Sequence, residues 1–349
     1  MSVDPSIKIL RWYDSEPRPL PWRAAGAAPA DPYRVWLSEI MLQQTTVAAV
    51  RPYYASFTAR WPTVEALAAA DEAELMAAWA GLGYYARARN LLACARQVAE
   101  QHDGRFPADE AALLKLPGVG RYTAAAIAAI AFGRRAVVVD GNVERVVARL
   151  FDVQAPLPKA RAQLRLLADR ITPDERAGDF AQAMMDLGRT VCTPRRPKCD
   201  LCPIAAECVA RAEGRQEALP VREAKRARPQ REGFAYWLEH DGHVLLVRRA
   251  SEGLLGGMLA LPTGAWEAQA DSSGGAPMAA RWEEAGSIDH VFTHFALRLH
   301  VLRAEAPDRS AGEIWWPVDA LDEAGLPTLF AKVANRARAA GQPLLDRAA

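Results

Sequence analysis

The chain has 349 residues, which is more than one hydrophobic core usually holds, so we expect two domains. Half of the residues are hydrophobic, but no apolar run reaches membrane-spanning length and the N-terminus shows no signal peptide, which predicts a cytoplasmic protein without a membrane partner. The formal net charge of +1 excludes a uniformly basic nucleic-acid binder, so any affinity for DNA must come from local patches.

The first motif is an aromatic and basic segment interrupted by prolines, Leu20-Pro21-Trp22-Arg23. It can be a strap that packs on the core, or it can be the wall of a pocket. In a pocket, the aromatic faces would stack on a base and the guanidinium of Arg23 would reach the edge of the base. Composition alone favours the strap.

The next helix is predicted to begin at Asp31-Pro32 and to continue through residues 33–50. Glu39 lies in this helix among apolar residues such as Trp36 and Ile40. Removal from water favours the neutral form of a carboxyl group, which makes Glu39 a candidate general acid. The alternative is a glutamate at the edge of the apolar stripe that reaches water, as most glutamates do.

Gln43 and Gln44 follow one turn after this glutamate, and their amides can either contact base edges or lie on a solvated helix surface. A loop framed by Gly81 and Gly83 comes later and leads into Tyr84 and Arg87. This loop can push a wedge into a base stack and hold the flanking phosphates. It can equally be a corner where two helices pack.

Residues 109–132 predict two helices joined by a tight turn, Leu116-Pro117-Gly118-Val119-Gly120. The glycines allow positive φ and close backbone approach, and free N–H groups at the start of the second helix suit a phosphate oxygen. An ordinary packing hairpin fits the same pattern equally well. An apolar run then leads to Asp140, which is followed by Gly141 and Asn142.

Further helices are predicted over residues 143–191, in which Gln182 faces either a base pocket or the core. Four cysteines follow with the spacing C-x6-C-x2-C-x5-C over residues 192–208. Such a group in a reducing compartment indicates a metal centre rather than disulfides. The spacing alone is compatible with zinc or with a 4Fe-4S cluster.

The composition changes after the cysteines. Residues 211–231 are rich in arginine and contain two prolines, which is typical of an extended, basic interdomain linker. Alternating patterns at 234–238, 244–247 and 297–302 then predict strands, with Asp241-Gly242 as a hairpin turn.

Two of these motifs resemble a known family. Leu116-Pro117-Gly118-Val119-Gly120, followed by Val139-Asp140-Gly141-Asn142-Val143, is similar to the helix-hairpin-helix plus Gly/Pro-Asp module of DNA base-excision glycosylases. Within that superfamily the chain resembles the MutY family of adenine DNA glycosylases, from about Trp12 to Cys208 and more weakly beyond. The cysteine spacing is that of the iron–sulfur loop in this family and in endonuclease III.

The resemblance implies a mainly α catalytic domain over residues 1–210, with the hairpin at about 109–132 and the iron–sulfur loop at 192–208. The linker at 211–231 and an α/β Nudix-like lesion-recognition domain at 232–349 would follow. Gly253–Pro262 resembles the entry to a Nudix fold, and Arg281–Gly286 resembles the end of a Nudix box. Ala279-Ala280 stand where that box should carry Arg-Glu, which undermines a Mg²⁺ site.

The resemblance also implies roles for single residues. Glu39 would be the catalytic acid, and Asp140 would stabilise positive charge on the sugar, either electrostatically or as a transient covalent partner. Asn142 and Tyr122 would orient the carboxylates and the water. The implied adenine pocket is Leu20, Trp22, Arg23 and Gln182; the implied DNA contacts are Gln43, Gln44, Tyr84, Arg87, Gly118, Val119 and Gly120; the implied 4Fe-4S ligands are Cys192, Cys199, Cys202 and Cys208; and the implied lesion-recognition loop is Phe292, Thr293 and His294.

The expected function is a monomeric, monofunctional glycosylase that releases adenine mispaired with 8-oxoguanine or guanine in the DNA of the nucleoid. A bifunctional glycosylase/lyase related to endonuclease III is the nearest alternative. It needs an amine nucleophile, and Tyr122 stands where those lyases carry a lysine. A Nudix pyrophosphohydrolase and a non-catalytic DNA-binding protein are the alternatives from other classes.

Overall fold

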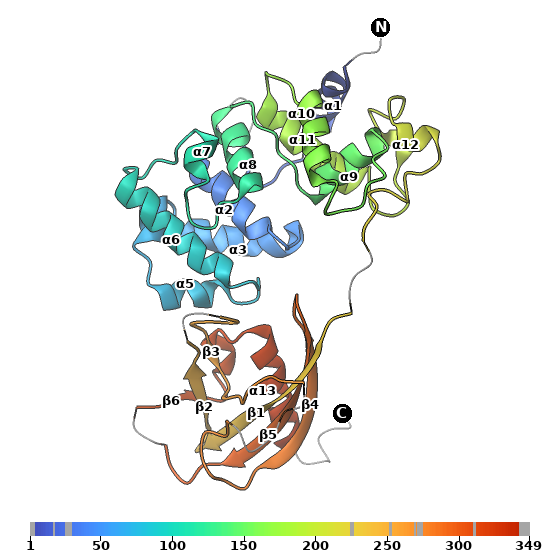
Figure 1. Cartoon of the computed structure of the whole chain (residues 1–349). Helices are drawn as coiled ribbons and strands as arrows, with labels where there is room; N and C mark the ends of the chain where they lie inside the picture. Colours follow the sequence, from blue (N-terminus) through green and yellow to red (C-terminus); the bar gives the residue numbers. More distant parts are fainter. Residues whose placement is uncertain are drawn as a thin grey trace. The chain divides into compact units, whose positions relative to one another are not determined.

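The computed structural model describes residues 4–16, 18–24, 30–223, 227–250, 253–268, 270, 275–309 and 312–341. Its contacts divide the chain into two compact units, which are described separately (Figure 1). The first unit comprises Met1–Ala70 and Asn90–Lys225, and the second comprises Asp71–Arg89 and Arg226–Ala349. The domain boundaries given above stay a prediction, and residues 224–226 of the expected linker lie outside the described residues.

The chain before residue 213 is helical. Its helices are α1 (Pro5–Ser15), α2 (Pro32–Leu42), α3 (Val47–Arg60), α4 (Val64–Ala68), α5 (Glu72–Trp79), α6 (Ala86–Gln101), α7 (Glu110–Leu113), α8 (Arg121–Phe132), α9 (Gly141–Leu150), α10 (Arg161–Ile171), α11 (Ala177–Thr190) and α12 (Val209–Ala212), with a 3-10 turn η1 (Cys199–Leu201) in the cysteine loop. Among the described residues, no helix has the length and apolar character needed to cross a membrane.

Helix α2 begins as expected and ends earlier than expected. Asp31 caps it by accepting a hydrogen bond from the backbone N–H of Tyr33 at 2.9 Å. The helix stops at Leu42, because Gln44 adopts a left-handed conformation with φ of 59° and Thr46 caps the start of α3. The expectation of one helix over residues 33–50 was therefore wrong, and the paired amides lie in a turn rather than on a helix surface.

The hairpin between α7 and α8 has the predicted form, and α8 spans Arg121–Phe132. Gly118 needs to be glycine, because its φ is +72° and a Cβ there would lie 2.8 Å from the Cβ of Asn90. Gly120 has a φ of −88° and is the N-cap of α8, so only one of the two glycines uses the left-handed region.

Helix α11 packs against α8 and α9 at the centre of the first unit. Two of its glycines permit this approach. A Cβ on Gly178 would lie 2.4 Å from the carbonyl oxygen of Ala129 in α8, and a Cβ on Gly188 would lie 2.7 Å from the Cβ of Asn142 in α9. The close packing brings one face of α11 to the N-terminus of α9.

The C-terminal part forms a mixed sheet covered by a helix (Figure 1). Its strands are β1 (Gln230–His240), β2 (His243–Arg248), β3 (Leu259–Ala260), β4 (Glu283–Val291), β5 (Ala296–Glu305) and β6 (Ile314–Pro317), followed by η2 (Leu321–Ala324) and α13 (Thr328–Gly341). In the described residues the order is β3-β2-β1-β5-β4, with β6 on β2; β1 and β5 are parallel. Asp241-Gly242 makes the predicted hairpin turn, with φ of 46° and 67°.

The segment that resembles the end of a Nudix box enters strand β4 at Glu283. Glu283 and Glu284 are adjacent on this strand, so their side chains point to opposite faces of the sheet. A β-bulge follows between Glu284 and Gly286. These two carboxylates therefore cannot share one Mg²⁺ ion, which strengthens the case against a working Nudix site.

Candidate active site

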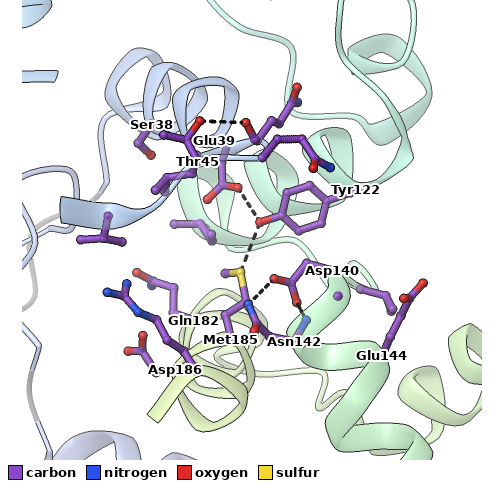
Figure 2. A pocket seen from close by; sticks show the side chains of 18 of the residues that line it. Ser38, Glu39, Thr45, Tyr122, Asp140, Asn142, Glu144, Gln182, Met185 and Asp186 are labelled. Atoms are coloured by element: carbon purple, nitrogen blue, oxygen red, sulfur yellow. Dashed lines mark hydrogen bonds between the residues drawn. The ribbon is translucent and has the colours of Figure 1, made fainter. Parts of the chain in front are cut away.

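A cavity of about 920 Å³ lies in the first unit, between the N-terminal segment, α2, α8, α9 and α11. Figure 2 shows acidic and amide side chains from these separate elements pointing into the same space. The sequence-predicted residues that line this cavity are Leu20, Trp22, Arg23, Glu39, Gln43, Gln44, Tyr122, Asp140, Asn142 and Gln182.

Glu39 is buried, with 6% of its surface exposed. The hydroxyl of Tyr122 donates a hydrogen bond to Glu39 Oε2 at 2.6 Å (Figure 2). Burial, with a smaller contribution from the charge of Asp140, raises the pKa of Glu39 to about 7, although the hydrogen bond from Tyr122 and the charge of Arg23 oppose the increase. This carboxyl group can therefore hold a proton near neutral pH, as a general acid requires.

Tyr122 projects from the first turn of α8 toward Glu39. Its hydroxyl also lies 3.2 Å from the sulfur of Met185 on α11. Burial, and then the charge of Glu39, raises the pKa of Tyr122 well above its usual value, so the hydroxyl stays protonated and acts as a donor.

Asp140 is the N-cap of α9. Its Oδ1 accepts hydrogen bonds from the backbone N–H groups of Asn142 at 2.9 Å and Val143 at 2.8 Å, and its Oδ2 accepts one from Asn142 Nδ2 at 2.7 Å. Burial raises the pKa of Asp140, but these donors oppose the shift. Three hydrogen-bond donors and the N-terminus of α9 stabilise the anion of Asp140, whereas Tyr122 is the donor to Glu39. As the pH falls, Glu39 is therefore protonated before Asp140.

Asn142 is held in turn by Arg145 of the same helix. Arg145 Nη2 donates to Asn142 Oδ1 at 3.0 Å and to the carbonyl of Gly188 at 2.6 Å, and its Nε donates to the carbonyl of Cys192 at 2.8 Å. Hydrogen bonds therefore fix the N-terminal turn of α9 to the end of α11 and to the cysteine loop.

The cavity wall contains an ion pair that the sequence did not predict. Asp186 on α11 is 3% exposed and accepts hydrogen bonds from Arg18 Nη1 at 2.9 Å and Arg23 Nη1 at 2.7 Å. Trp22 is buried beside them and packs edge-on against Tyr54, with ring centroids 5.2 Å apart. The available signal was the spacing of Asp186, one helical turn after Gln182.

The lining of the cavity is rich in arginine. It includes Arg121, Arg161, Arg165, Arg189 and Arg222, besides Arg23. Arg161 and Arg165 form ion pairs with Glu144 and Glu110, at 3.0 and 3.4 Å. A chain with a net charge of only +1 thus gathers six arginines around one cavity, which is the kind of local patch that contact with phosphates requires.

Some of the expected DNA contacts lie outside this cavity. Tyr84 is 54% exposed and has a left-handed φ of 51°, in keeping with a side chain presented to a partner. Arg87 is only 9% exposed, and its Nη2 donates to the carbonyls of Leu82 and Gly83, both at 3.1 Å. Its guanidinium lies 5.6 Å from the ring centroid of Tyr84 and 5.3 Å from that of Trp79. Arg87 is thus better placed to brace the loop than to reach a phosphate.

The remaining residues that were expected to contact DNA lie in the hairpin before α8 and in the turn after α2. Gly118, Val119 and Gly120 form the turn that leads into the free N–H groups of α8. Gln43 donates through Nε2 to the hydroxyl of Thr123 at 3.2 Å, and Gln44 is exposed beside it.

The four clustered cysteines line one small cavity, together with Arg149 and Arg211. All five cysteines of the chain are free. Within the described residues, no three His, Cys, Asp or Glu side chains converge closely enough to hold a single metal ion. Four cysteine sulfurs around one space supply the number of ligands that an iron–sulfur cluster takes.

Arg149 of α9 lies against this cysteine loop and is 1% exposed. Its guanidinium donates to the sulfur of Cys192 at 3.3 Å and to the carbonyls of Thr193, Pro194 and Leu219 at 2.8, 3.1 and 3.1 Å. A donor to sulfur suits an anionic cluster, so the residues present fit such a group.

The expected lesion-recognition loop is the turn between β4 and β5. Thr293 and His294 are exposed at its tip, and Phe292 N–H donates to the carbonyl of Phe295 at 2.9 Å. Phe295 is buried, and Phe292 stacks on Trp266 with ring centroids 5.8 Å apart. The aromatic residues therefore anchor a turn that presents a hydroxyl and an imidazole.

Three family models match the chain. Residues 37–169 match the HhH-GPD superfamily of base excision DNA repair proteins, residues 192–208 match the iron–sulfur binding domain of endonuclease III, and residues 233–336 match the NUDIX domain. These matches confirm the predicted glycosylase fold, the iron–sulfur loop and the Nudix-like domain.

Similar proteins cover most of the sequence. The chain is 36% identical to the adenine DNA glycosylase of Homo sapiens over 394 residues, covering 93% of this chain and 72% of that protein. It is 42% identical to the adenine DNA glycosylase of Mycolicibacterium smegmatis over 226 residues, covering 65% and 75%. Among solved structures it resembles a thermostable thymine-DNA glycosylase, with 32% identity and a TM-score of 0.54 over 60% of this chain and 95% of the other.

Proposed function

The chain belongs to the adenine DNA glycosylases of the HhH-GPD base excision repair superfamily, and on that premise we propose that it is a monofunctional enzyme that removes adenine mispaired with 8-oxoguanine or guanine in double-stranded DNA. The observation that carries the proposal is a pair of carboxyl groups in one cavity, one buried (Glu39) and one partly buried (Asp140). Glu39 has its pKa raised to about 7, and Asp140 is held as the N-cap of α9.

The adenine must leave the base stack to reach these groups. We place it against Trp22, with its edge toward Arg23 and Gln182 and near the carboxyl of Glu39. Tyr122 occupies Oε2 of Glu39, so Oε1 is the oxygen that presents the proton to a ring nitrogen of adenine. When the bond between C1′ and N9 breaks, its electron pair leaves with the base, and the proton from Glu39 neutralises that charge.

The sugar becomes positively charged as the base departs. Asp140 stabilises this charge, either as an anion or through a transient bond to C1′. Water then adds its hydroxyl to C1′, and its remaining proton restores the acid. Asn142 and Tyr122 orient the two carboxyl groups and the water through the hydrogen bonds already described.

A lyase step would need an amine that attacks C1′. Among the described residues, the lining of the cavity includes no lysine, and Tyr122 occupies the place where an amine would be expected. This supports release of the base without strand cleavage.

DNA is the partner of this enzyme family. We assign the contacts to the strand opposite the adenine to Gln43 and Gln44, the wedge to Tyr84, the phosphate site to Gly118, Val119 and Gly120, and the sensing of 8-oxoguanine to Phe292, Thr293 and His294. We also propose that the protein acts as a monomer in the nucleoid and that its domains divide at residues 210 and 231.

We further propose that the iron–sulfur centre is a 4Fe-4S cluster on Cys192, Cys199, Cys202 and Cys208. When bound, the cluster holds the basic loop in shape, and no step of the glycosidic cleavage depends on it. About four irons per chain are expected in anaerobically purified protein. Stoichiometric zinc without iron would contradict the assignment.

The test of function is a panel of labelled duplexes with adenine opposite 8-oxoguanine, guanine, cytosine or thymine, and with the other bases in mispairs. Adenine should be released opposite 8-oxoguanine and guanine, and the strand should break only after alkali. Borohydride trapping as efficient as that of a true lyase would favour the bifunctional alternative. Release of no base from any duplex would favour a non-catalytic DNA-binding protein.

A further inference from the structure

Asp186 is the buried acid of the cavity that the proposed mechanism does not use. Its side chain is 5% exposed and lies between two guanidinium groups, with Oδ1 paired to Arg18 and Oδ2 paired to Arg23. The two arginines are 168 and 163 residues away in sequence. A buried carboxylate is tolerated only when it is paired, so this bridge fixes the N-terminal segment to α11.

The surroundings of Asp186 are strongly cationic. Arg189, on the next turn of α11, interacts electrostatically with Arg18, Arg23 and Arg51 as well as with Asp186. Asp186 therefore lies among four arginines, Arg18, Arg23, Arg51 and Arg189, and pairs directly with the first two. Without its charge the cations would repel one another, and Arg23 would have no fixed partner on the wall of the cavity.

The bridge leaves part of Arg23 available. Its Nη1 is engaged by Asp186 and, at 3.5 Å, by the carbonyl of Arg18. Its guanidinium also lies 5.8 Å from the ring centroid of Tyr13. The remaining donors stand beside Trp22 and in the same cavity as Glu39. Ring nitrogens of adenine are acceptors, so a guanidinium held rigidly at this wall can bind the base edge without losing side-chain entropy.

We propose that Asp186 is a positioning residue for the adenine: it holds Arg23 at the base edge, and it cancels part of the positive charge beside Glu39. The inference deepens the proposed function and rests on it, because it assumes that adenine occupies this cavity.

The test is a double-mutant cycle on single-turnover adenine release. We expect Asp186→Asn to slow release by about 10- to 100-fold, the range of a hydrogen bond to a charged group. Arg23→Ala should slow it similarly. If Asp186 acts through Arg23, adding Asp186→Asn to Arg23→Ala should change the rate by less than about threefold, because the pair is already broken. Rate effects that simply multiply would overturn the inference.

A matched control lies on the same helix. Asp179 of α11 is also an aspartate paired with an arginine, Arg176, at 2.8 Å, but its side chain is 41% exposed and it is not among the described residues that line the cavity. Asp179→Asn should release adenine at the wild-type rate. Absence of release by wild type and control alike would mean that the proposed function fails. Normal release by both, with multiplicative effects at Asp186 and Arg23, would overturn only the positioning role.

A pH profile separates positioning from a general loss of structure. The groups that face Glu39 are Tyr122 from α8, Asp140 from α9 and Arg23 from the N-terminal segment. Asp186→Asn leaves the charge of Arg23 less compensated, which lowers the pKa of Glu39, so the decline in rate on raising the pH should begin at a lower pH than in the wild type. A profile with an unchanged midpoint would overturn the charge-cancelling role.

Asp186→Glu keeps the charge but moves the arginine. It should slow release while leaving the midpoint of the pH profile where it is in the wild type. If Asp186→Asn does not fold, as judged by circular dichroism and thermal unfolding, Asp186→Glu combined with Arg23→Ala carries the same cycle. An Asp186→Glu protein with the full wild-type rate would overturn the positioning role.

Discussion

At the scale of single residues, two carboxyl groups in one cavity have different environments. Glu39 and Asp140 could both be identified from short sequence motifs, but their protonation could not, because it depends on contacts from other elements. Tyr122, 83 residues away, donates to Glu39, whereas the backbone of α9 supplies donors to Asp140. The difference in protonation between Glu39 and Asp140 thus depends on the tertiary structure.

The first prediction concerns Glu39. Glu39→Gln keeps an acceptor for Tyr122 but carries no acidic proton, so adenine release should fall by at least about a hundredfold while binding of mismatched DNA is kept. Wild-type activity should decline as the pH rises through about 7, the pKa of the buried acid. Single-turnover rates and gel-shift titrations across pH measure both effects. Near-normal cleavage by Glu39→Gln would show that another group is the acid.

The same substitution should change stability with a defined sign. The pKa of Glu39 is raised from 4.5 to about 7 on folding, so the unfolded state releases its proton first. The wild type therefore loses stability as the pH rises from about 4.5 to 7, and the glutamine variant does not lose that part. We expect Glu39→Gln to melt at a higher temperature than the wild type at pH 8 but not at pH 4. Equal melting curves at both pH values would indicate that Glu39 reaches water.

The second prediction uses the glycines of α11. A Cβ at Gly188 would press on Asn142, which supports Asp140, so Gly188→Ala should slow adenine release by roughly 10- to 100-fold through misplacement of the anion. Gly178→Ala is the control, because its clash falls on the backbone of α8 instead. It should lower the melting temperature without slowing release by the folded enzyme. Equal rate losses in both variants would indicate a global effect.

At the scale of secondary-structure elements, the accuracy of each predicted helix end depended on the turn and capping residues near that end. The glycine turn and the alanine-rich run were sufficient to place α8 at its observed bounds. The end of α2 was missed, because the apolar spacing continues past Leu42 while Thr46 starts a new helix. The capping residue therefore determined where the helix ends more strongly than the apolar periodicity did.

The third prediction concerns the loop between α5 and α6. The guanidinium of Arg87 lies 5.3 Å from the ring centroid of Trp79 and 5.6 Å from that of Tyr84, and it donates to two carbonyls of the loop. Lysine keeps the charge but loses the planar stack and the fork of donors. Arg87→Lys should therefore slow excision from duplex DNA by roughly tenfold, through poorer presentation of Tyr84.

Fluorescence of 2-aminopurine beside the target adenine reports insertion of the wedge directly. Arg60→Lys is the matched control, since Arg60 lies 5.1 Å from the ring centroid of Trp61 and should be replaceable without effect on excision. If Arg87 were a phosphate ligand instead, Arg87→Lys would keep the excision rate and Arg87→Met would weaken binding mainly at low salt.

At the scale of the whole molecule, the sequence predicted a helical part followed by a sheet-containing part, and it predicted ten of the residues that line the cavity. It did not reveal the contacts that join distant segments. Asp186 with its two arginines and Arg149 with the cysteine loop each link elements that no local pattern connects. Local motifs indicate chemistry, but the partners of buried charges follow only from the tertiary structure.

The fourth prediction concerns the C-terminal part. The carboxyl pair and the cysteine loop lie before residue 211, so truncation near Arg222 should leave adenine release intact and impair discrimination. Thr293 and His294 are exposed at the tip of the turn and can offer a donor and an acceptor. One or two hydrogen bonds are worth about 0.5–1.5 kcal/mol each, so the preference for 8-oxoguanine over guanine should fall roughly tenfold.

Thr293→Ala combined with His294→Ala should reproduce most of that loss in the full-length chain. The measurement is the Kd of 8-oxoguanine:adenine and guanine:adenine duplexes that carry a non-cleavable adenine analogue. Guanine serves as the internal control, because a general loss of affinity would lower both values alike. An unchanged ratio in both altered proteins would assign lesion recognition to the first unit.

Arg149 has a consequence for how the protein is made. The arginine lies in α9, and its acceptors are Cys192, Thr193 and Pro194 at the start of the cysteine loop and Leu219 after its end. A buried guanidinium must find these partners as the chain folds, since leaving it unpaired is costly. Folding of the chain therefore ties both ends of the cysteine loop to α9 through one side chain.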